Sequence, residues 1–140
     1  MAHKKPLPIR MIPPRLLILD DEAPVAEAIS WIARSIGWQV STTHDPQEAM
    51  ALLRNNAADV FLTDYNMPQC NGLEVIENLR LGQSTMPVIL MSGLTRTIDR
   101  SRAQRLGVLA VLEKPFDLHL LTDALKQALA LIPVQPEQMA

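Results

Sequence analysis

The sequence has little cysteine, few aromatic residues and no long apolar run. Cys70 is the only cysteine among 140 residues, so no disulfide can form within the chain. No apolar run approaches the ~20 residues of a membrane-spanning helix, and no apolar stretch follows the basic start, as it would in a secretory signal. The net charge of −2 gives no electrostatic reason for nucleic-acid binding. We therefore expect a cytoplasmic protein that binds neither membranes nor nucleic acid directly.

The chain does have enough apolar residues to build one core of ordinary domain size. Hydrophobic residues make up 48% and charged residues 20%, a composition that favours a folded domain over disorder. Residues 1–14 contain four prolines and basic side chains but no acid, which predicts a flexible Pro-rich arm. Met11 is an alternative start. We expect one domain over residues 15–132 and a tail, or the start of a linker, over residues 133–140.

Short apolar runs alternate with amphipathic segments along the expected domain. The runs at 16–19, 40–43, 60–63, 87–91 and 108–112 predict strands, most of them buried on both faces. Helices are predicted near 25–36, 46–54, 73–80, 97–106 and 118–132, with Asp45 and Asp117 as N-caps. Strict alternation of strand and helix implies right-handed crossovers. We predict an α/β, flavodoxin-like, doubly wound (βα)5 fold. Its five-stranded parallel sheet has the order 2-1-3-4-5, with helices on both faces.

Chemically active side chains follow four of the five predicted strands. They are Asp20 and Asp21 after the first strand, Asp64 after the third, Ser92 after the fourth and Lys114 after the fifth. Ligands of an open parallel sheet bind at the carboxyl ends of its strands, so these groups should converge. Three clustered carboxylates require a cation, and oxygen donors favour Mg²⁺. The lysine and the hydroxyl suit phosphoryl oxygens, so the set predicts a phosphoryl-transfer site.

Each of these residues has a simpler interpretation when taken alone. Asp21 or Glu22 could cap the first helix, Ser92 could be a turn residue and Lys114 a solvated surface group. Their joint occurrence at the strand ends favours the phosphoryl site. The sequence contains no phosphate-binding P-loop, no dinucleotide-binding glycine pattern and no nucleophile elbow that would indicate a rival chemistry.

The joint spacing resembles that of a known family. An acid pair at Asp20-Asp21, the stretch Asp64-Tyr-Asn-Met-Pro68 with Gly72, then Ser92 and Lys114-Pro-Phe116 are similar to the receiver domain of two-component response regulators. The likeness covers about residues 15–132. It implies a phosphorelay signalling domain that assists its own phosphorylation and dephosphorylation, rather than an enzyme with a separate substrate.

The resemblance implies a role for each matching residue. Asp64 is the implied phosphoacceptor. The phosphoryl group would come from a sensor histidine kinase or a histidine phosphotransfer protein. The implied ligands of Mg²⁺, or of Mn²⁺ in its place, are Asp20, Asp21, Asp64 and the backbone carbonyl of Asn66. The implied contacts of the phosphoryl group are the Ser92 hydroxyl, the Lys114 amine and the backbone N–H groups of Tyr65 and Gly93. The Lys114–Pro115 bond is implied to be cis.

One position departs from the family pattern. Val111 lies three residues before Lys114, where the family usually has a Tyr or Phe that swings inward as the hydroxyl residue moves. Valine can make no such exchange, so a phosphorylation-independent binding module remains an alternative. A receiver fragment of a longer regulator with a DNA-binding or enzymatic output domain is another. A phosphatase using Asp64 as nucleophile is disfavoured, because Asn66 cannot be its acid/base.

Other residues suggest a surface for partners. Arginines crowd the fourth predicted helix and its lead-in, at Arg96, Arg100, Arg102 and Arg105. In this family the face of the fourth helix, fifth strand and fifth helix is the usual output and dimerisation surface, although a solvated helix face is the plainer interpretation. The implied partners are the phosphodonor, a downstream protein or an output domain of the same chain, and a second copy. Trp31 and Trp38 are predicted to pack in the core or between helix and sheet.

Overall fold

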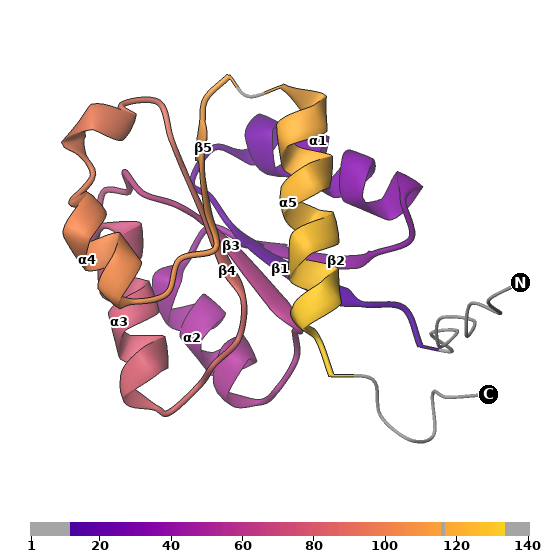
Figure 1. Cartoon of the computed structure of the whole chain (residues 1–140), viewed down its shortest axis with the longest axis horizontal. Helices are drawn as coiled ribbons and strands as arrows, with labels where there is room; N and C mark the ends of the chain where they lie inside the picture. The colour runs from indigo at the N-terminus through magenta and orange to yellow at the C-terminus, as the bar shows by residue number, and fades with distance from the viewer. Residues whose placement is uncertain (1–11, 116, 134–140) are drawn as a thin grey trace, which may run out of the picture.

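The strands of this computed structural model form a single parallel sheet (Figure 1). The model describes residues 12–115 and 117–133, so most of the predicted arm and tail, with Met11 and Phe116, lie outside the described residues. The strands are β1 (Arg15–Leu19), β2 (Gln39–Thr43), β3 (Val60–Asp64), β4 (Val88–Ser92) and β5 (Ala110–Glu113). Their order is β2-β1-β3-β4-β5. The predicted fold class and strand order are therefore confirmed.

Helices cover both faces of the sheet. They are α1 (Ala23–Ser35), α2 (Pro46–Arg54), α3 (Gly72–Leu81), α4 (Arg100–Arg105) and α5 (Leu118–Leu131), with a 3₁₀ turn η1 (Thr95–Thr97) before α4. Figure 1 shows α1 and α5 on one side of the sheet and α2, α3 and α4 on the other. The part of the chain that the structure describes contains no helix long and apolar enough to cross a membrane.

Two cores form because alternate strand residues point to opposite faces of the sheet. Leu16 of β1 packs with Ile29 in the core under α1 and α5. Leu17, the next residue, packs with Phe61 and Ile76 in the core under α2, α3 and α4. All five side chains are at most 1% exposed, and burying each contributes about 1.5–3 kcal/mol. The central strands are thus held rigidly from both sides, which fixes the positions of their carboxyl ends.

Capping side chains set where several helices begin. The Asp45 and Asp117 carboxylates accept hydrogen bonds from the backbone N–H groups of Gln47 and His119, which confirms both predicted caps. Asn71 caps α3 in the same way. At the start of α1 the N-cap residue is Glu22, whose side chain makes no capping bond. That carboxylate faces the site described below instead.

The region between β4 and β5 differs most from the prediction. We predicted one helix over 97–106, but a 3₁₀ turn comes first and α4 begins only after Asp99. The Asp99 carboxylate accepts the Arg102 N–H at 3.0 Å and so starts the helix there. The strand predicted from residue 108 begins at Ala110, because the Val108 N–H bonds back to Ala103 and closes the helix end.

The two tryptophans differ in burial. Trp38 is 5% exposed and belongs to the core under α1 and α5, as predicted. Trp31 is 74% exposed, so the packing predicted for it is wrong. Its place on α1 turns the indole away from the sheet, because the buried face of that helix is formed by Ala26, Ile29 and Ala33.

Candidate functional site

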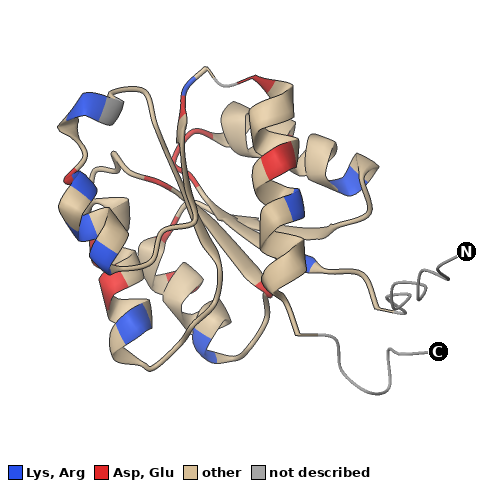
Figure 2. Ribbon diagram, viewed as in Figure 1, with Lys and Arg blue, Asp and Glu red and all other residues tan. Residues whose placement is uncertain are grey.

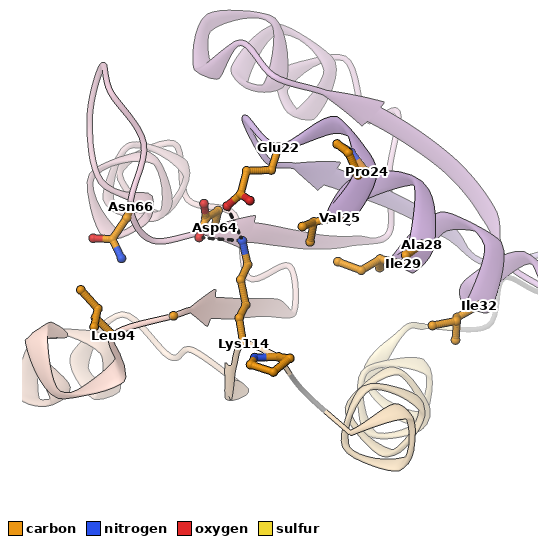
Figure 3. Close-up of a pocket in the computed structure, with 12 residues that line it drawn as sticks. Glu22, Pro24, Val25, Ala28, Ile29, Ile32, Asp64, Asn66, Leu94 and Lys114 are labelled. Carbon is orange, nitrogen blue, oxygen red and sulfur yellow. Dashed lines mark ion pairs between the residues drawn. The ribbon is translucent and has the colours of Figure 1, made fainter.

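The side chains predicted at the strand ends meet at the carboxyl edge of the sheet. Figure 3 shows the Lys114 side chain, which comes directly after β5, pointing toward Asp64 and Glu22. Its Nζ is 3.1 Å from Asp20 Oδ2, 3.4 Å from Asp64 Oδ1 and 3.6 Å from Glu22 Oε1. The Lys114–Pro115 peptide is cis, as the resemblance implied. One lysine thus faces carboxylates from two adjacent strands, β1 and β3.

Burial makes these carboxylates costly to ionise. Asp20 is 1% and Asp64 3% exposed. Desolvation raises the pKa of Asp64 from 3.8 to about 6, although the Lys114 charge acts against the shift. Desolvation also raises the pKa of Asp20. Burial alone would lower the pKa of Lys114, but its hydrogen bond to Asp20 and the surrounding carboxylates raise it, so the ammonium form is held firmly.

The carboxylates at this edge can supply a cation site. Asp20, Asp21, Glu22 and Asp64 each offer an oxygen, and these atoms all lie within 4.8 Å of one another. The donors are all carboxylate oxygens, which suits Mg²⁺ or Mn²⁺ better than zinc. Lys114 neutralises only part of their charge. The residues present therefore fit a hard divalent ion. Glu22, which we considered only as a cap, is an additional member of the cluster.

Ser92 lies at the end of β4 with its side chain enclosed. The residue is fully buried, and its Oγ accepts hydrogen bonds from Asn66 Nδ2 at 3.1 Å and from the Leu94 N–H at 3.0 Å. Sequence reasoning assigned Asn66 a backbone role only and missed this side-chain bond. Gly93 lines the same cavity as Asp64 and Lys114.

The backbone of Tyr65 does not point where we expected. Its N–H donates to the Met91 carbonyl at 2.8 Å, which extends the pairing of β3 with β4 by one residue. This N–H is engaged by the sheet and is not offered to the Asp64 carboxylate. The predicted contact of Tyr65 with a phosphoryl group therefore finds no support in this structure.

Gly72 holds the Asp64 backbone in place. A Cβ at Gly72 would lie 2.5 Å from the Asp64 carbonyl oxygen, so any larger residue would push the two segments apart. The Gly72 N–H also donates to the Tyr65 carbonyl at 2.9 Å. The glycine eight residues after Asp64 is the sequence signal for this close approach.

An apolar groove leads away from the site along α1. A cavity of about 790 Å³ extends from Asp64 and Lys114 along Pro24, Val25 and Ala28. A second hollow of about 560 Å³ continues past Trp31, Ile36 and Leu118, and the two share Ala28 and Ile32. Figure 2 shows that α1 carries few charged residues. We call the surface formed by Pro24, Ala28, Trp31, Ile32, Ile36 and Leu118 the α1 groove.

The structure also places the arginines of the fourth predicted helix and Val111. Figure 2 shows basic residues gathered along η1 and α4. Arg96, Arg100 and Arg105 are exposed, whereas Arg102 is half-buried and forms an ion pair with Glu77 of α3. Val111 is half-buried against the core under α2, α3 and α4.

The family model of the response regulator receiver domain matches residues 16–126. The chain belongs to the response regulator receiver domain family. Receiver domains are signalling domains rather than classical enzymes, and they bind Mg²⁺ through acidic residues, which agrees with the cluster found here.

Individual proteins give the same assignment. The receiver domain is 32% identical to TcrX of Mycobacterium tuberculosis over 106 residues, 76% of this chain and 45% of TcrX. It is 30% identical to the cell cycle response regulator CtrA of Brucella ovis over 102 residues, 73% of this chain and 44% of CtrA. It thus spans a little under half the length of these relatives. The structure of the chemotaxis response regulator CheY4 of Vibrio cholerae shares the fold, with a TM-score of 0.75 and 24% identity over 84% of this chain and 99% of CheY4.

Proposed function

We propose that this receiver domain accepts a phosphoryl group on Asp64 from the phosphohistidine of a sensor kinase or a histidine phosphotransfer protein. One observation carries the proposal. Asp64 is a buried carboxylate 3.4 Å from the Lys114 ammonium, inside a cluster of oxygen donors suited to a divalent ion. A carboxylate held there is a nucleophile with its charge-stabilising partners already in position.

The transfer is a displacement at phosphorus. An ionised Asp64 oxygen attacks the phosphorus, the P–N bond to the imidazole breaks, and the bonding electrons leave with the histidine nitrogen. Asp64 must be deprotonated to attack, and because desolvation raises its pKa to about 6 in the metal-free protein, positive charge at the site would favour the reactive carboxylate form. Lys114 pairs with one phosphoryl oxygen and Ser92 donates its hydroxyl to another.

A divalent ion would be held by the carboxylates whose charge Lys114 alone cannot neutralise. Asp20, Asp21, Asp64 and the Asn66 carbonyl would hold Mg²⁺, or Mn²⁺ in its place, which supplies positive charge to the phosphoryl oxygens. Asp20 also accepts the Glu22 N–H at 2.9 Å, which orients its carboxylate at the start of α1.

The phosphodonor protein would dock beside the site on the α1 groove. The cavity beside Asp64 continues along this groove to Trp31, whose exposed indole is the kind of side chain that anchors protein interfaces. A helix that carries the phosphohistidine could lie in this apolar groove and bring the phosphorus to Asp64. The single cysteine fits a reducing compartment, and we propose that the partners meet in the cytoplasm.

The proposal is tested with a small acyl phosphate as donor in the presence of Mg²⁺. We expect the wild-type chain to gain the mass of one phosphoryl group and the Asp64→Asn variant to gain none, because an amide is not a competent nucleophile. Asp123→Asn, which changes an exposed acid on α5, is the control and should be labelled like the wild type. Label retained by Asp64→Asn would overturn the assignment.

A second candidate function is a binding module that does not switch. The observation that favours it is Val111, which lacks both the ring and the hydroxyl of the usual residue at that position. Output in either case would use the exposed Arg96, Arg100 and Arg105, through a downstream protein, a second copy or a further domain of a longer regulator. A wild-type chain that binds its target equally with and without the phosphoryl group would favour this module.

A further inference from the structure

The Ser92 hydroxyl has both of its acceptor positions filled. A serine hydroxyl offers one hydrogen and accepts up to two hydrogen bonds. Asn66 Nδ2 donates to Ser92 Oγ from 3.1 Å, and the Leu94 N–H donates to the same oxygen from 3.0 Å. The residue is fully buried, so water does not compete for the oxygen. With both acceptor positions used, the Ser92 hydrogen is the one group that the hydroxyl can still offer.

The surroundings indicate where that hydrogen is needed. Asn66, Leu94 and Asp64 line one cavity together with Lys114 (Figure 3). Ser92 ends β4 next to β3, since Asp64 pairs with Met91 in the sheet register. A phosphoryl group on Asp64 would enter this cavity, where Lys114 can neutralise only part of its charge. A further donor would therefore stabilise it.

We propose that the Asn66 side chain is a positioning residue that turns the Ser92 hydrogen toward a phosphoryl group on Asp64. By donating to Ser92 Oγ, the amide occupies a lone pair and leaves the hydroxyl as a pre-oriented donor. The inference rests on the proposed phosphorylation of Asp64 and is separate from the backbone carbonyl of Asn66. Pre-orientation matters because a hydroxyl whose hydrogen already faces the phosphoryl group needs no further rotation as Ser92 moves toward it, and such a donor stabilises the transition state more strongly.

The geometry also defines what would undo the effect. A residue of similar size without a donor, as in Asn66→Leu, frees a lone pair and lets the hydroxyl rotate. The backbone carbonyl of residue 66 is unchanged by that substitution. The loss must then act through Ser92, and it should disappear when the hydroxyl is already absent. This dependence on a second residue separates positioning from a general effect on the fold or the metal.

A double-mutant cycle measures that dependence. The rate of phosphorylation by a small acyl phosphate at saturating Mg²⁺ is compared for the wild type, Asn66→Leu, Ser92→Ala and the double variant. We expect Asn66→Leu to slow the reaction about five- to tenfold with Ser92 present and less than about twofold in the Ser92→Ala background. Affinity for beryllofluoride, an analogue of the phosphoryl group, is the equilibrium readout and should show the same coupling.

The controls keep the outcomes distinct. Asn78→Leu, an exposed asparagine on α3, should leave the rate unchanged. Thermal unfolding checks each variant, and Asn66→Ala replaces Asn66→Leu if the larger side chain prevents folding. Equal losses from Asn66→Leu with and without Ser92 would overturn the positioning role while phosphorylation of Asp64 stands. A wild-type chain that takes no label would overturn the proposed function, and this inference with it.

Discussion

The surroundings of Asp64 favour its neutral form when no cation is bound. Its carboxylate is almost completely buried, and the nearby acids Asp20 and Asp21 oppose its ionisation. Lys114 offsets part of this penalty, yet the pKa still rises to about 6. A residue that is costly to ionise in the free protein gains most when positive charge is supplied. The same property that suits phosphoryl chemistry therefore reduces the stability of the metal-free fold.

Replacing Asp64 should make the metal-free protein more stable at neutral pH. We expect Asp64→Asn to raise the free energy of unfolding by about 1–3 kcal/mol at pH 7.5 in chelator, because a shift of one pKa unit corresponds to about 1.4 kcal/mol. Urea unfolding monitored by tryptophan fluorescence measures the change. Asp123→Asn on the surface of α5 is the matched control and should change stability by less than about 0.5 kcal/mol.

The stability gained by Asp64→Asn should depend on pH in a defined direction. The pKa of Asp64 is about 6 in the folded chain, and its ordinary value of 3.8 applies to the unfolded chain. Between these two pH values the folded state therefore binds the proton more tightly than the unfolded state. Stability from this group is therefore lost as pH rises from about 4 to about 6. The advantage of Asp64→Asn should be small at pH 4 and reach its plateau above pH 7. An advantage that is largest at low pH would contradict this account.

The sequence predicted part of the site, for a physical reason. Asp20, Asp64, Ser92 and Lys114 directly end or follow buried strands, so the topology alone brings them to one edge. The bond from Asn66 to Ser92 and the engagement of the Tyr65 N–H depend on which of several close partners each group meets in three dimensions. No spacing in a single sequence encodes that choice.

Among the elements, α1 and α4 explain where sequence patterns mislead. The apolar residues of α1 recur at helical spacing, but they cover a wider face of the helix than the sheet can bury. Trp31 is therefore left exposed. The predicted fourth helix was too long because Asp99 can continue a helix or cap one, and here it caps. The strands β1, β3 and β4 were predictable because runs buried on both faces have no polar alternation.

The exposed Trp31 indole on α1 should contribute to binding a protein partner but not to the reaction at Asp64. We expect Trp31→Ala to slow phosphoryl transfer from a phosphohistidine protein at least tenfold, because large aromatic anchors typically contribute about 2 kcal/mol or more to an interface. Labelling by a small acyl phosphate should be unchanged, since Trp31 lies away from Asp64 in the groove. The two rates are measured on the same preparation. Equal slowing with both donors would show that the substitution acts through the fold instead.

Two polar contacts, one from a half-buried arginine and one a partly exposed ion pair, help to attach α4. The Arg80 guanidinium donates to the carbonyls of Leu106 at 2.8 Å, Met86 at 2.7 Å and Ser84 at 3.2 Å, which ties α3 to the end of α4. Burial lowers its pKa from the usual value. The Arg102–Glu77 pair is partly exposed on both sides.

These two anchors should differ in strength. We expect Arg80→Gln to lower the free energy of unfolding by about 2–4 kcal/mol, because it leaves several carbonyls without a charged donor. Arg102→Gln should cost less than about 1 kcal/mol, the usual range for a solvent-exposed pair. Denaturant unfolding of both variants gives the comparison. Similar losses from the two substitutions would mean that the surface ion pair is as important as the half-buried arginine.

At the scale of the whole molecule, the site and the Arg-rich surface are joined by a short path. Ser92 accepts the Leu94 N–H, the Thr97 N–H in turn donates to the Leu94 carbonyl, and two residues separate η1 from α4. A phosphoryl group that draws in Ser92 therefore pulls on the loop that leads into α4. Each new charge-assisted hydrogen bond is worth about 1.5–3 kcal/mol, enough to shift a loosely attached helix. Val111 cannot add the ring movement usual in this family, so the loop must carry the change.

Hydrogen exchange should locate that change. With beryllofluoride and Mg²⁺ bound, we expect altered protection at residues 92–107, while β5 around Val111 stays as it was. The α4 segment should respond because few of its residues are anchored in the core; Ile98 and Ala103 are the fully buried apolar residues between 93 and 107 for which burial is described. The Asp64→Asn variant under the same conditions is the control and should show no change. Protection altered only in the acidic loops after β1 and β3 would indicate that the site is loaded without moving α4, which is the behaviour of a module that does not switch.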